Sequence, residues 1–253
     1  MQRAITGWAA LHPGECLDAL LLGVTPEIAE MQWPERSSLT AVDKSLPMVS
    51  RVWPGNIPGR RSVVCGNWLT LPRRESSCHI AAGDGSFNCL AYPLEFRAVA
   101  EGISTVLRDG GTLILRCYLQ NAVPESPEQV YADLSRGTIG SFHALKLRLL
   151  MALQKNPQEG VPVRDAYRSW TARHLHPESL PSGQGWQNSA IETIEYYKNS
   201  GTVYAFPTLA GMRALLGEFF DEVSLFTPSY ELGDRCPTLV LRPRHKTSRV
   251  HRF

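Results

Sequence analysis

Residues 17–27 read LDALLLGVTPE, an apolar run that ends near Gly23 and is followed by Thr25-Pro26-Glu27. The apolar run predicts a buried strand over 17–24. Thr25 suits a helix N-cap, Pro suits the first helical position, and Glu27 complements the helix dipole, so a helix is predicted over 26–33. Gly23, at the end of the strand, leaves room for a ligand close to the backbone.

The same alternation of apolar runs and helical stretches continues along the next ninety or so residues of the chain. Further strands are predicted at 38–42, 61–65, 78–82 and 112–119, and helices at 46–52 and 94–108, the last ending at Gly110-Gly111. Near the C-terminus, a helix at 208–220 precedes strands at 222–226 and 238–241 that are spaced as a hairpin. Strands that alternate with helices indicate βαβ units and a mostly parallel sheet.

Residues 121–200 break this pattern, because they contain no convincing strand and three helical stretches, at 127–154, 163–174 and 189–199. The sequence therefore predicts an α/β fold: a doubly wound, mostly parallel seven-stranded sheet with a C-terminal antiparallel hairpin and a helical insertion. The sheet is assigned to residues 1–120 and 201–242, the insertion to 121–200, and a basic, disordered tail to 243–253.

The charge of the chain is nearly balanced, with 26 basic and 24 acidic residues. Five of the basic residues lie at 242–253, so the rest carries a net charge of −3 and offers no global field for nucleic acid. No run of 18 apolar residues predicts a membrane span, and the N-terminal stretch does not read as a signal peptide. Six cysteines without a CxxC pair fit a reducing compartment, so a cytoplasmic protein is expected.

Three further strand ends carry residues suited to a ligand. Asp43 follows Gly23 by 20 residues, the spacing of the acid that holds the ribose hydroxyls of a bound nucleoside. After the third strand, the Asn67 amide suits the edge of adenine and Trp68 suits its face. After the fourth, Gly83-Asp84-Gly85-Ser86 indicates a close backbone approach to a bound group. A capped helix or a surface turn explains any one of these segments alone; the Gly23–Asp43 pairing favours a nucleoside site.

In this order, LLLGVTPEIAEM, LTAVDKS, VVCGNWLTLP, CHIAAGDGSFNCL and TLILRCYL resemble a class I S-adenosylmethionine-dependent methyltransferase. The likeness is greatest to a divergent bacterial branch whose first motif reads LGxTPE and in which an acid precedes MVxxVWPG, here at 48–55. It covers residues 17–120 and 207–242. The resemblance implies methyl transfer from S-adenosylmethionine to a small-molecule N or O acceptor, with S-adenosylhomocysteine as product.

The resemblance also implies a role for each strand end. The loop after the first strand would line the methionine half of the cofactor, through Gly23, Val24, Thr25 and Glu27. The next two strand ends would hold the ribose and adenine, through Asp43, Lys44, Asn67, Trp68 and Leu69. The block after the fourth strand would lie near the sulfonium and the acceptor, through Gly83, Asp84, Gly85 and Ser86.

Methyl transfer from a sulfonium is an in-line displacement that mainly needs alignment and the exclusion of water. An N or O acceptor also needs a base in some cases, and the candidates are Asp84, His143 and Tyr204. His79 falls inside a predicted strand and is expected to be a core or supporting residue. The aromatic-rich insertion is expected to cap a small, partly apolar acceptor, although a helical core or a homodimer contact explains its composition equally well.

Two other functions stay open. Because the glycine-rich loop retains only Gly23, the chain also fits a catalytically inactive binding or scaffold protein on a methyltransferase fold. The basic tail allows RNA as an acceptor, which is the less favoured reading because nucleic acid is not an expected partner. His174 and His176, with Glu178, have metal-ligand chemistry, but two His at i and i+2 do not share a helix face, so no metal is predicted.

Overall fold

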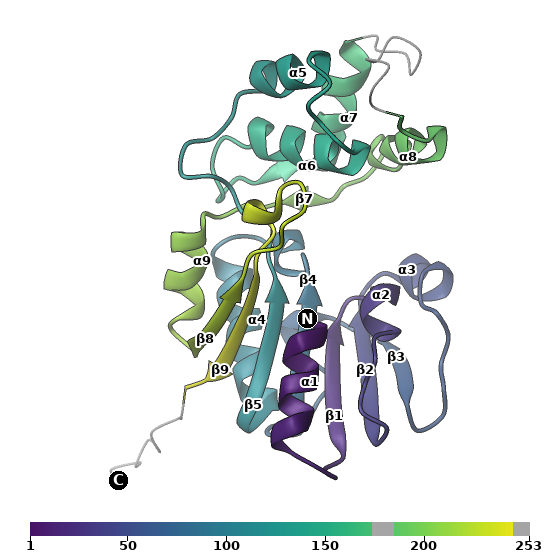
Figure 1. Cartoon of the computed structure of the whole chain (residues 1–253), viewed down its shortest axis with the longest axis vertical. Coiled ribbons are helices and arrows are strands. Elements are labelled where there is room, and N and C mark those ends of the chain that lie inside the picture. Colours follow the sequence, from purple (N-terminus) through teal and green to yellow (C-terminus); the bar gives the residue numbers. More distant parts are fainter. Residues whose placement is uncertain (174–184, 245–253) are drawn as a thin grey trace.

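The computed structural model describes residues 1–173 and 185–244, and shows a seven-stranded sheet with helices on both faces and a helical group beyond one end (Figure 1). The strand order is β3-β2-β1-β4-β5-β9-β8, with β9 antiparallel to both of its neighbours and the other pairings parallel. The strands are β1 (Leu17–Leu22), β2 (Ser37–Asp43), β3 (Arg61–Cys65), β4 (Cys78–Asp84), β5 (Leu107–Arg116), β8 (Phe220–Phe226) and β9 (Thr238–Pro243). The predicted doubly wound sheet with its C-terminal hairpin is confirmed.

Helices cover both faces of the sheet, which is why its central strands are apolar throughout. The helices of this layer are α1 (Gln2–Leu11), α2 (Pro26–Ala29), α3 (Leu46–Arg51), α4 (Leu94–Val106) and α9 (Leu209–Leu216). Along β1, Ala19 and Leu21 join the core under α1 and α2, whereas Leu20 and Leu22 join the core under α4 and α9. This period of two places one side chain on each face in turn.

The helix after β1 starts as predicted and ends early. Thr25 is its N-cap and Pro26 lies in its first turn, but α2 stops at Ala29, four residues before the predicted end. The Trp33 indole donates a hydrogen bond to the carbonyl of Ile28, which takes up an acceptor that a longer helix would use. The predicted helix over 26–33 is therefore too long.

The two glycines expected to end α4 lie inside β5 instead. The helix ends at Val106 and the strand begins at Leu107, with a register shift against β4. A Cβ on Gly111 would lie 2.7 Å from the carbonyl oxygen of Arg108, so the glycine permits a bulge rather than a helix stop. The strand also ends at Arg116, not at 119, because the chain then bonds to the loop before β9, through Cys117 N–H to Pro237 O.

Three elements depart from the prediction elsewhere. The N-terminal helix α1 was not expected; it buries only Ile5 and Trp8 against the sheet. A two-stranded ribbon joins β6 (Val161–Pro162), inside the segment expected to hold no strand, to β7 (Val203–Tyr204). Strand β8 begins at Phe220, two residues early, because α9 ends at Leu216. Within 1–173 and 185–244, no helix is both long and apolar enough to traverse a bilayer.

The insertion forms its own helical core beyond the carboxyl ends of the parallel strands (Figure 1). Its helices are α5 (Pro127–Ser135), α6 (Phe142–Leu153), α7 (Val163–Ala172) and α8 (Asn188–Glu192), and 3-10 turn η4 covers Thr193–Tyr197. The helical stretch over 127–154 splits in two because α5 ends before Gly137, which has a φ of +71°. Phe142 and Trp170, whose rings meet edge to face at 5.2 Å, lie at the centre of this core.

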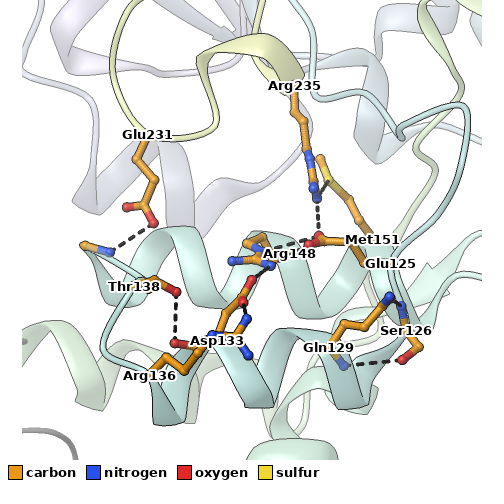
Figure 2. A network of polar contacts seen from close by, with 11 residues as sticks. Glu125, Ser126, Gln129, Asp133, Arg136, Thr138, Arg148, Met151, Glu231 and Arg235 are labelled. Atoms are coloured by element: carbon orange, nitrogen blue, oxygen red, sulfur yellow. Dashed lines mark hydrogen bonds and ion pairs between the residues drawn. The ribbon is translucent and has the colours of Figure 1, made fainter.

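A buried ionic network joins the insertion to the C-terminal hairpin (Figure 2). Glu125 accepts from Arg148 of α6 on one side and forms an ion pair with Arg235, 2.6 Å away, on the other. Arg148 also pairs with Asp133 of α5. Both guanidinium groups are buried, so the network replaces their lost hydration with fixed carboxylates.

The segments that enter and leave the insertion meet at one side chain. Buried Asn88 donates from Nδ2 to the carbonyl oxygens of Tyr118 and Ala205, both at 2.7 Å, and its Oδ1 accepts from Tyr118 N–H at 3.0 Å.

At the other end of the chain, Arg244 forms an ion pair with Asp221 of β8, so ordered contacts continue just past the assigned core. Residues 245–253 of the expected tail lie outside the described residues.

Candidate functional site

The strand ends singled out in the sequence lie side by side along one edge of the sheet. Strands β3, β2, β1, β4 and β5 are consecutive and parallel, so their carboxyl ends point the same way, toward the insertion (Figure 1). The strand order reverses between β1 and β4, and open α/β sheets bind ligands at the carboxyl edge near such a point.

The corner formed by β1, β2 and the loop after β3 brings together Gly23, Asp43 and Trp68. Gly23 has a φ of +101°, and a Cβ on it would lie 3.8 Å from the Trp68 ring and 3.9 Å from Asp43 Oδ2. Asp43 Oδ1 accepts from Ser45 N–H at 2.8 Å, which fixes the carboxylate and leaves Oδ2 available to a ligand hydroxyl. The predicted Gly23–Asp43 pairing is thus close in space.

The loop after β3 is held by its own hydrogen bonds. Trp68 Nε1 donates to the carbonyl oxygen of Val42 at 2.6 Å, which lays the indole along the edge of the sheet. Asn67 Oδ1 accepts from Leu69 N–H at 3.0 Å and caps 3-10 turn η1 (Trp68–Thr70). An adenine amino group would therefore share that oxygen with Leu69.

A cavity of 820 Å³ opens between this corner and the insertion. Four of the predicted cofactor residues line it: Asp43, Lys44, Asn67 and Trp68. The opposite wall comes from residues 157–160 and 201–205, on either side of the β6–β7 ribbon. The remaining predicted cofactor residues do not line this cavity: Gly23, Val24, Thr25, Glu27, Leu69, Gly83, Asp84, Gly85 and Ser86.

At the end of β4, the carboxylate of Asp84 is paired with Arg116 of β5. Arg116 donates from Nε to Oδ1 and from Nη2 to Oδ2, both at 2.5 Å, and Tyr118 Oη donates to Oδ1 at 3.2 Å. Although burial opposes its charge, the hydrogen bonds and charge of Asp84 raise the pKa of Arg116 above its usual value. Because both carboxylate oxygens are occupied, the arrangement favours a positioning role for Asp84 over that of a free base.

The two glycines beside Asp84 make room for the protein's own side chains. A Cβ on Gly83 would collide with the hydroxyl of Ser86, and one on Gly85, whose φ is +60°, would collide with the ring of Tyr118. Ser86 is 4% exposed, and its hydroxyl has no hydrogen-bond partner within the described structure. A buried hydroxyl without a partner at the carboxyl end of a central strand suits a polar ligand.

The other two candidate bases lie at a second cavity of 400 Å³, between α6, the β8–β9 loop and the end of β5. His143 is exposed at its rim; partial burial and the charge of Lys146 lower the pKa of His143, so the ring is a neutral acceptor at pH 7. Tyr204 lines both cavities and so lies between them. Burial raises the pKa of Tyr204, which keeps its hydroxyl protonated. His143 is therefore the better base of the two.

His79 is confirmed as a buried supporting residue. It is 4% exposed, its Nδ1 accepts from Asp18 N–H at 2.9 Å, and its ring meets Trp8 of α1 edge to face. Burial lowers the pKa of His79 and keeps the ring neutral. It therefore joins α1 to β1 and lies outside both cavities.

Sequence reasoning missed three residues that shape the site. Arg116 was hidden in the apolar stretch TLILRCYL, where a lone charge was the only signal. Asn88 likewise interrupts an apolar run after the GDGS block, and Lys146 interrupts the buried face of α6. In each case the signal was a polar side chain in a buried element. No set of three or more His, Cys, Asp or Glu side chains in the described ranges is arranged to hold a metal ion, and His174, His176 and Glu178 lie outside those ranges.

Solved structures share this fold at low sequence identity. A SAM-dependent methyltransferase from Methanosarcina mazei is 14% identical, covers 92% of this chain and 93% of its own, and has a TM-score of 0.50. The 1,6-didemethyltoxoflavin-N1-methyltransferase of Burkholderia thailandensis, solved with 1,6-didemethyltoxoflavin and S-adenosylhomocysteine, is 13% identical over 96% and 78%, with a TM-score of 0.51.

The chain has the class I methyltransferase fold. A Rhodobacter sphaeroides protein named as a Zn-dependent alcohol dehydrogenase is also similar, at 13% identity over 94% and 90% with a TM-score of 0.59. Because one fold bears different names at such identities, the likeness establishes architecture and not activity. The sequence matches no protein-family model and no curated protein.

Proposed function

We propose that the chain is an S-adenosylmethionine-dependent methyltransferase that acts on an N or O atom of a small molecule. One observation carries the proposal: Asp43 is fixed by Ser45 N–H, and its second carboxylate oxygen, which has no hydrogen bond within the described residues, lies beside Gly23 at the carboxyl edge, next to the strand where the order reverses. A carboxylate there suits the two hydroxyls of a ribose. The methyltransferase fold supports the choice of nucleoside.

The residues at this edge fit S-adenosylmethionine, which supplies an activated methyl group on a sulfonium. Asp43 would hold the ribose, with Lys44 beside it, and the Trp68 indole would lie against the adenine next to Asn67 and Leu69. The loop of Gly23, Val24, Thr25 and Glu27 would face the methionine half. The unpartnered hydroxyl of Ser86 is a ready hydrogen-bond donor in the Gly83–Ser86 block nearest the acceptor.

The insertion would supply the acceptor side of the reaction. Its β6–β7 ribbon and α6 close over the strand ends and limit access of water, which favours an in-line displacement. His143 is neutral and exposed at the rim, so it would take the proton of an N–H or O–H acceptor. The Asp84–Arg116 pair would orient Tyr118.

Calorimetric titration with S-adenosylmethionine and S-adenosylhomocysteine tests the proposal. Asp43→Asn keeps the hydrogen bond to Ser45 N–H and removes the charge, so it should weaken cofactor binding by about tenfold or more. Asp221→Asn, on the far strand β8, is the matched control and should bind like the wild type. Folded wild-type protein that gives neither heat nor a thermal shift with either compound would falsify the proposal.

The occupied carboxylate of Asp84 favours one alternative, a non-catalytic binding protein on the same fold. Both of its oxygens bind Arg116, and the loop after β1 retains a single glycine. The alternative predicts a folded protein without turnover across a panel of amines, phenols and carboxylic acids, and cofactor that co-purifies with the protein would count against it. Formation of S-adenosylhomocysteine with any of them excludes it.

A further inference from the structure

The second cavity contains a buried lysine with unusual surroundings. Lys146 lies on α6, is 6% exposed, and lines the cavity between the insertion and the end of β5. Its Nζ donates to Thr193 Oγ1 at 2.6 Å, and Thr193 Oγ1 in turn donates to the carbonyl oxygen of Ala190. The rings of Phe142 and Tyr197 lie 5.8 and 5.2 Å from Nζ. One of the three ammonium hydrogens thus has a conventional acceptor.

Lys146 has no ion-pair partner among residues 1–173 and 185–244. The acidic side chain that lines the same cavity, Glu231, accepts from the backbone N–H of Gly140 at 2.9 Å. The other strong cation of the cavity, Arg116, is already neutralised by Asp84. Among the described residues, the ammonium of Lys146 and the carboxylate of Glu231 are thus the charges of this cavity without an ion-pair partner.

A buried charge without a counter-ion is costly, and side chains that keep one are rare outside functional sites. Burial lowers the pKa of Lys146 to about 8. At pH 7 about nine-tenths of the molecules still carry the ammonium, because the pH lies below that pKa. The cavity thus holds a cation that an incoming anion would stabilise.

The walls of the cavity indicate the rest of the ligand. Four tyrosines line it, Tyr118, Tyr197, Tyr204 and Tyr230, and its 400 Å³ accommodates a single-ring compound. One ammonium, aided by neighbouring hydroxyls, matches the single charge of a carboxylate, whereas a phosphate dianion usually requires an arginine or several backbone donors. Flat aromatic walls favour a flat aromatic body.

We propose that this cavity binds a small aromatic carboxylate, with the carboxylate paired to Lys146 and the ring between the tyrosines. Resting on the proposed function, this compound is the methyl acceptor, since Tyr204 separates this cavity from the one at Asp43. His143, three residues before Lys146 on α6, lies at the same rim. The pairing would hold the acceptor by a group other than the one that is methylated.

Binding of matched probes tests the proposal without any methyl transfer. The probes are benzoate, 4-hydroxybenzoate and phenylacetate, each compared with its carboxamide, titrated by calorimetry and ligand-observed NMR at pH 7. Wild-type protein should bind at least one acid about tenfold or more tighter than its amide, because a charge-assisted hydrogen bond replaces a neutral one. If the wild-type protein binds no acid more tightly than its carboxamide, the proposal is overturned. This outcome is read from the wild-type protein alone.

Two variants locate the site. Lys146→Met fills a similar volume without charge, and Lys146→Gln keeps a donor for Thr193; both should lose the preference for the acid and keep the affinity for the amide. Lys155→Met, at an exposed lysine just after α6, is the control and should retain the preference. Unchanged preference in either Lys146 variant places the carboxylate elsewhere and overturns the assignment. Because no cofactor is added, this outcome is separate from the titration with S-adenosylmethionine.

Discussion

Asp84 and Arg116 are register partners on the adjacent parallel strands β4 and β5, and their side chains form a two-point ion pair at the carboxyl ends of those strands. Arg116 lines the second cavity, and the hydroxyl of Tyr118, which lines it too, donates to Asp84. The Asp84 carboxylate can lie next to the buried core because its counter-ion, Arg116, is at the paired position of the neighbouring strand.

Arg116→Met should destabilise the fold, because it leaves the mostly buried Asp84 carboxylate without its partner. We expect a loss of about 2 kcal/mol in the free energy of unfolding, measured with urea at pH 7. The double variant Asp84→Asn with Arg116→Met removes the unpaired charge and should recover part of the loss. A single variant as stable as the wild type would show that the pair contributes nothing to the fold.

Gly85→Ala should disturb the site more than Gly110→Ala. Both glycines have positive φ, at +60° and +75°, so both alanines carry similar backbone strain of about 1 kcal/mol. Only at Gly85 would the new Cβ also press on the ring of Tyr118, since nothing lies within 4 Å of a Cβ at Gly110. Urea unfolding should show the larger loss for Gly85→Ala. Equal losses would mean that Tyr118 moves aside freely.

Glu125→Gln should unfasten the insertion from the hairpin. Breaking a buried ion pair by removing one partner costs about 3–5 kcal/mol, and here the change leaves Arg235 and Arg148 undercompensated. Glu128→Gln, an exposed carboxylate on α5, is the matched control and should change stability little. Hydrogen exchange should rise in α6 and in the β8–β9 loop only for Glu125→Gln.

The same carboxylate gives stability a defined pH dependence. Although burial opposes it, the hydrogen bonds of Arg235 and Arg148 lower the pKa of Glu125 below its usual value of 4.5. Its contribution is complete above the unfolded pKa and is lost as the pH falls through the lower, folded pKa. Glu125→Gln should therefore flatten the loss of stability below about pH 4.5. An unchanged acid limb in the variant would contradict this assignment.

Lys146 should act in the opposite direction, at alkaline pH. Its pKa is lowered by burial to about 8, so the unfolded chain binds more protons between pH 8 and 10.5 and the folded state gains stability as the pH rises through that window. Lys146→Met should remove this gain, on the order of 3 kcal/mol. The titratable groups that line the same cavity are Arg116, His143, Glu231, Cys236 and the tyrosines Tyr118, Tyr197, Tyr204 and Tyr230, and comparison with the variant subtracts their titration.

The sequence predicted the sheet well because each central strand is buried on both faces. An apolar run such as Leu17–Leu22 is stable only where both of its faces are buried. The residues that end the strand and start the next helix, Gly23 and Thr25-Pro26, follow it directly in the sequence. Asp43 could be placed beside Gly23 for the same reason, since parallel strands bring their carboxyl ends to one edge. Strand ends near Gly110-Gly111 were misplaced because a glycine pair signals a helix stop and a bulge alike.

Features that depend on contacts between residues far apart in the chain could not be predicted from the sequence. The two-residue strands β6 and β7 have no pattern of their own and exist only because Val161 pairs with Tyr204 across the insertion. Likewise, Lys146 interrupts the apolar face of α6, but this local signal does not tell whether the lysine has a counter-ion. Its isolation follows from packing against Thr193, Phe142 and Tyr197, which is set by tertiary contacts alone.

The bonds of Asn88 to Tyr118 and Ala205 mean that the insertion departs from the sheet and returns to it at a single point. A loop whose two ends are already joined imposes almost no stretching force on its host, and lengthening it costs only a logarithmic entropy term. The helical insertion is therefore a separable unit: under the proposed function, a change within it would alter the choice of methyl acceptor and leave the strands of the sheet as they are.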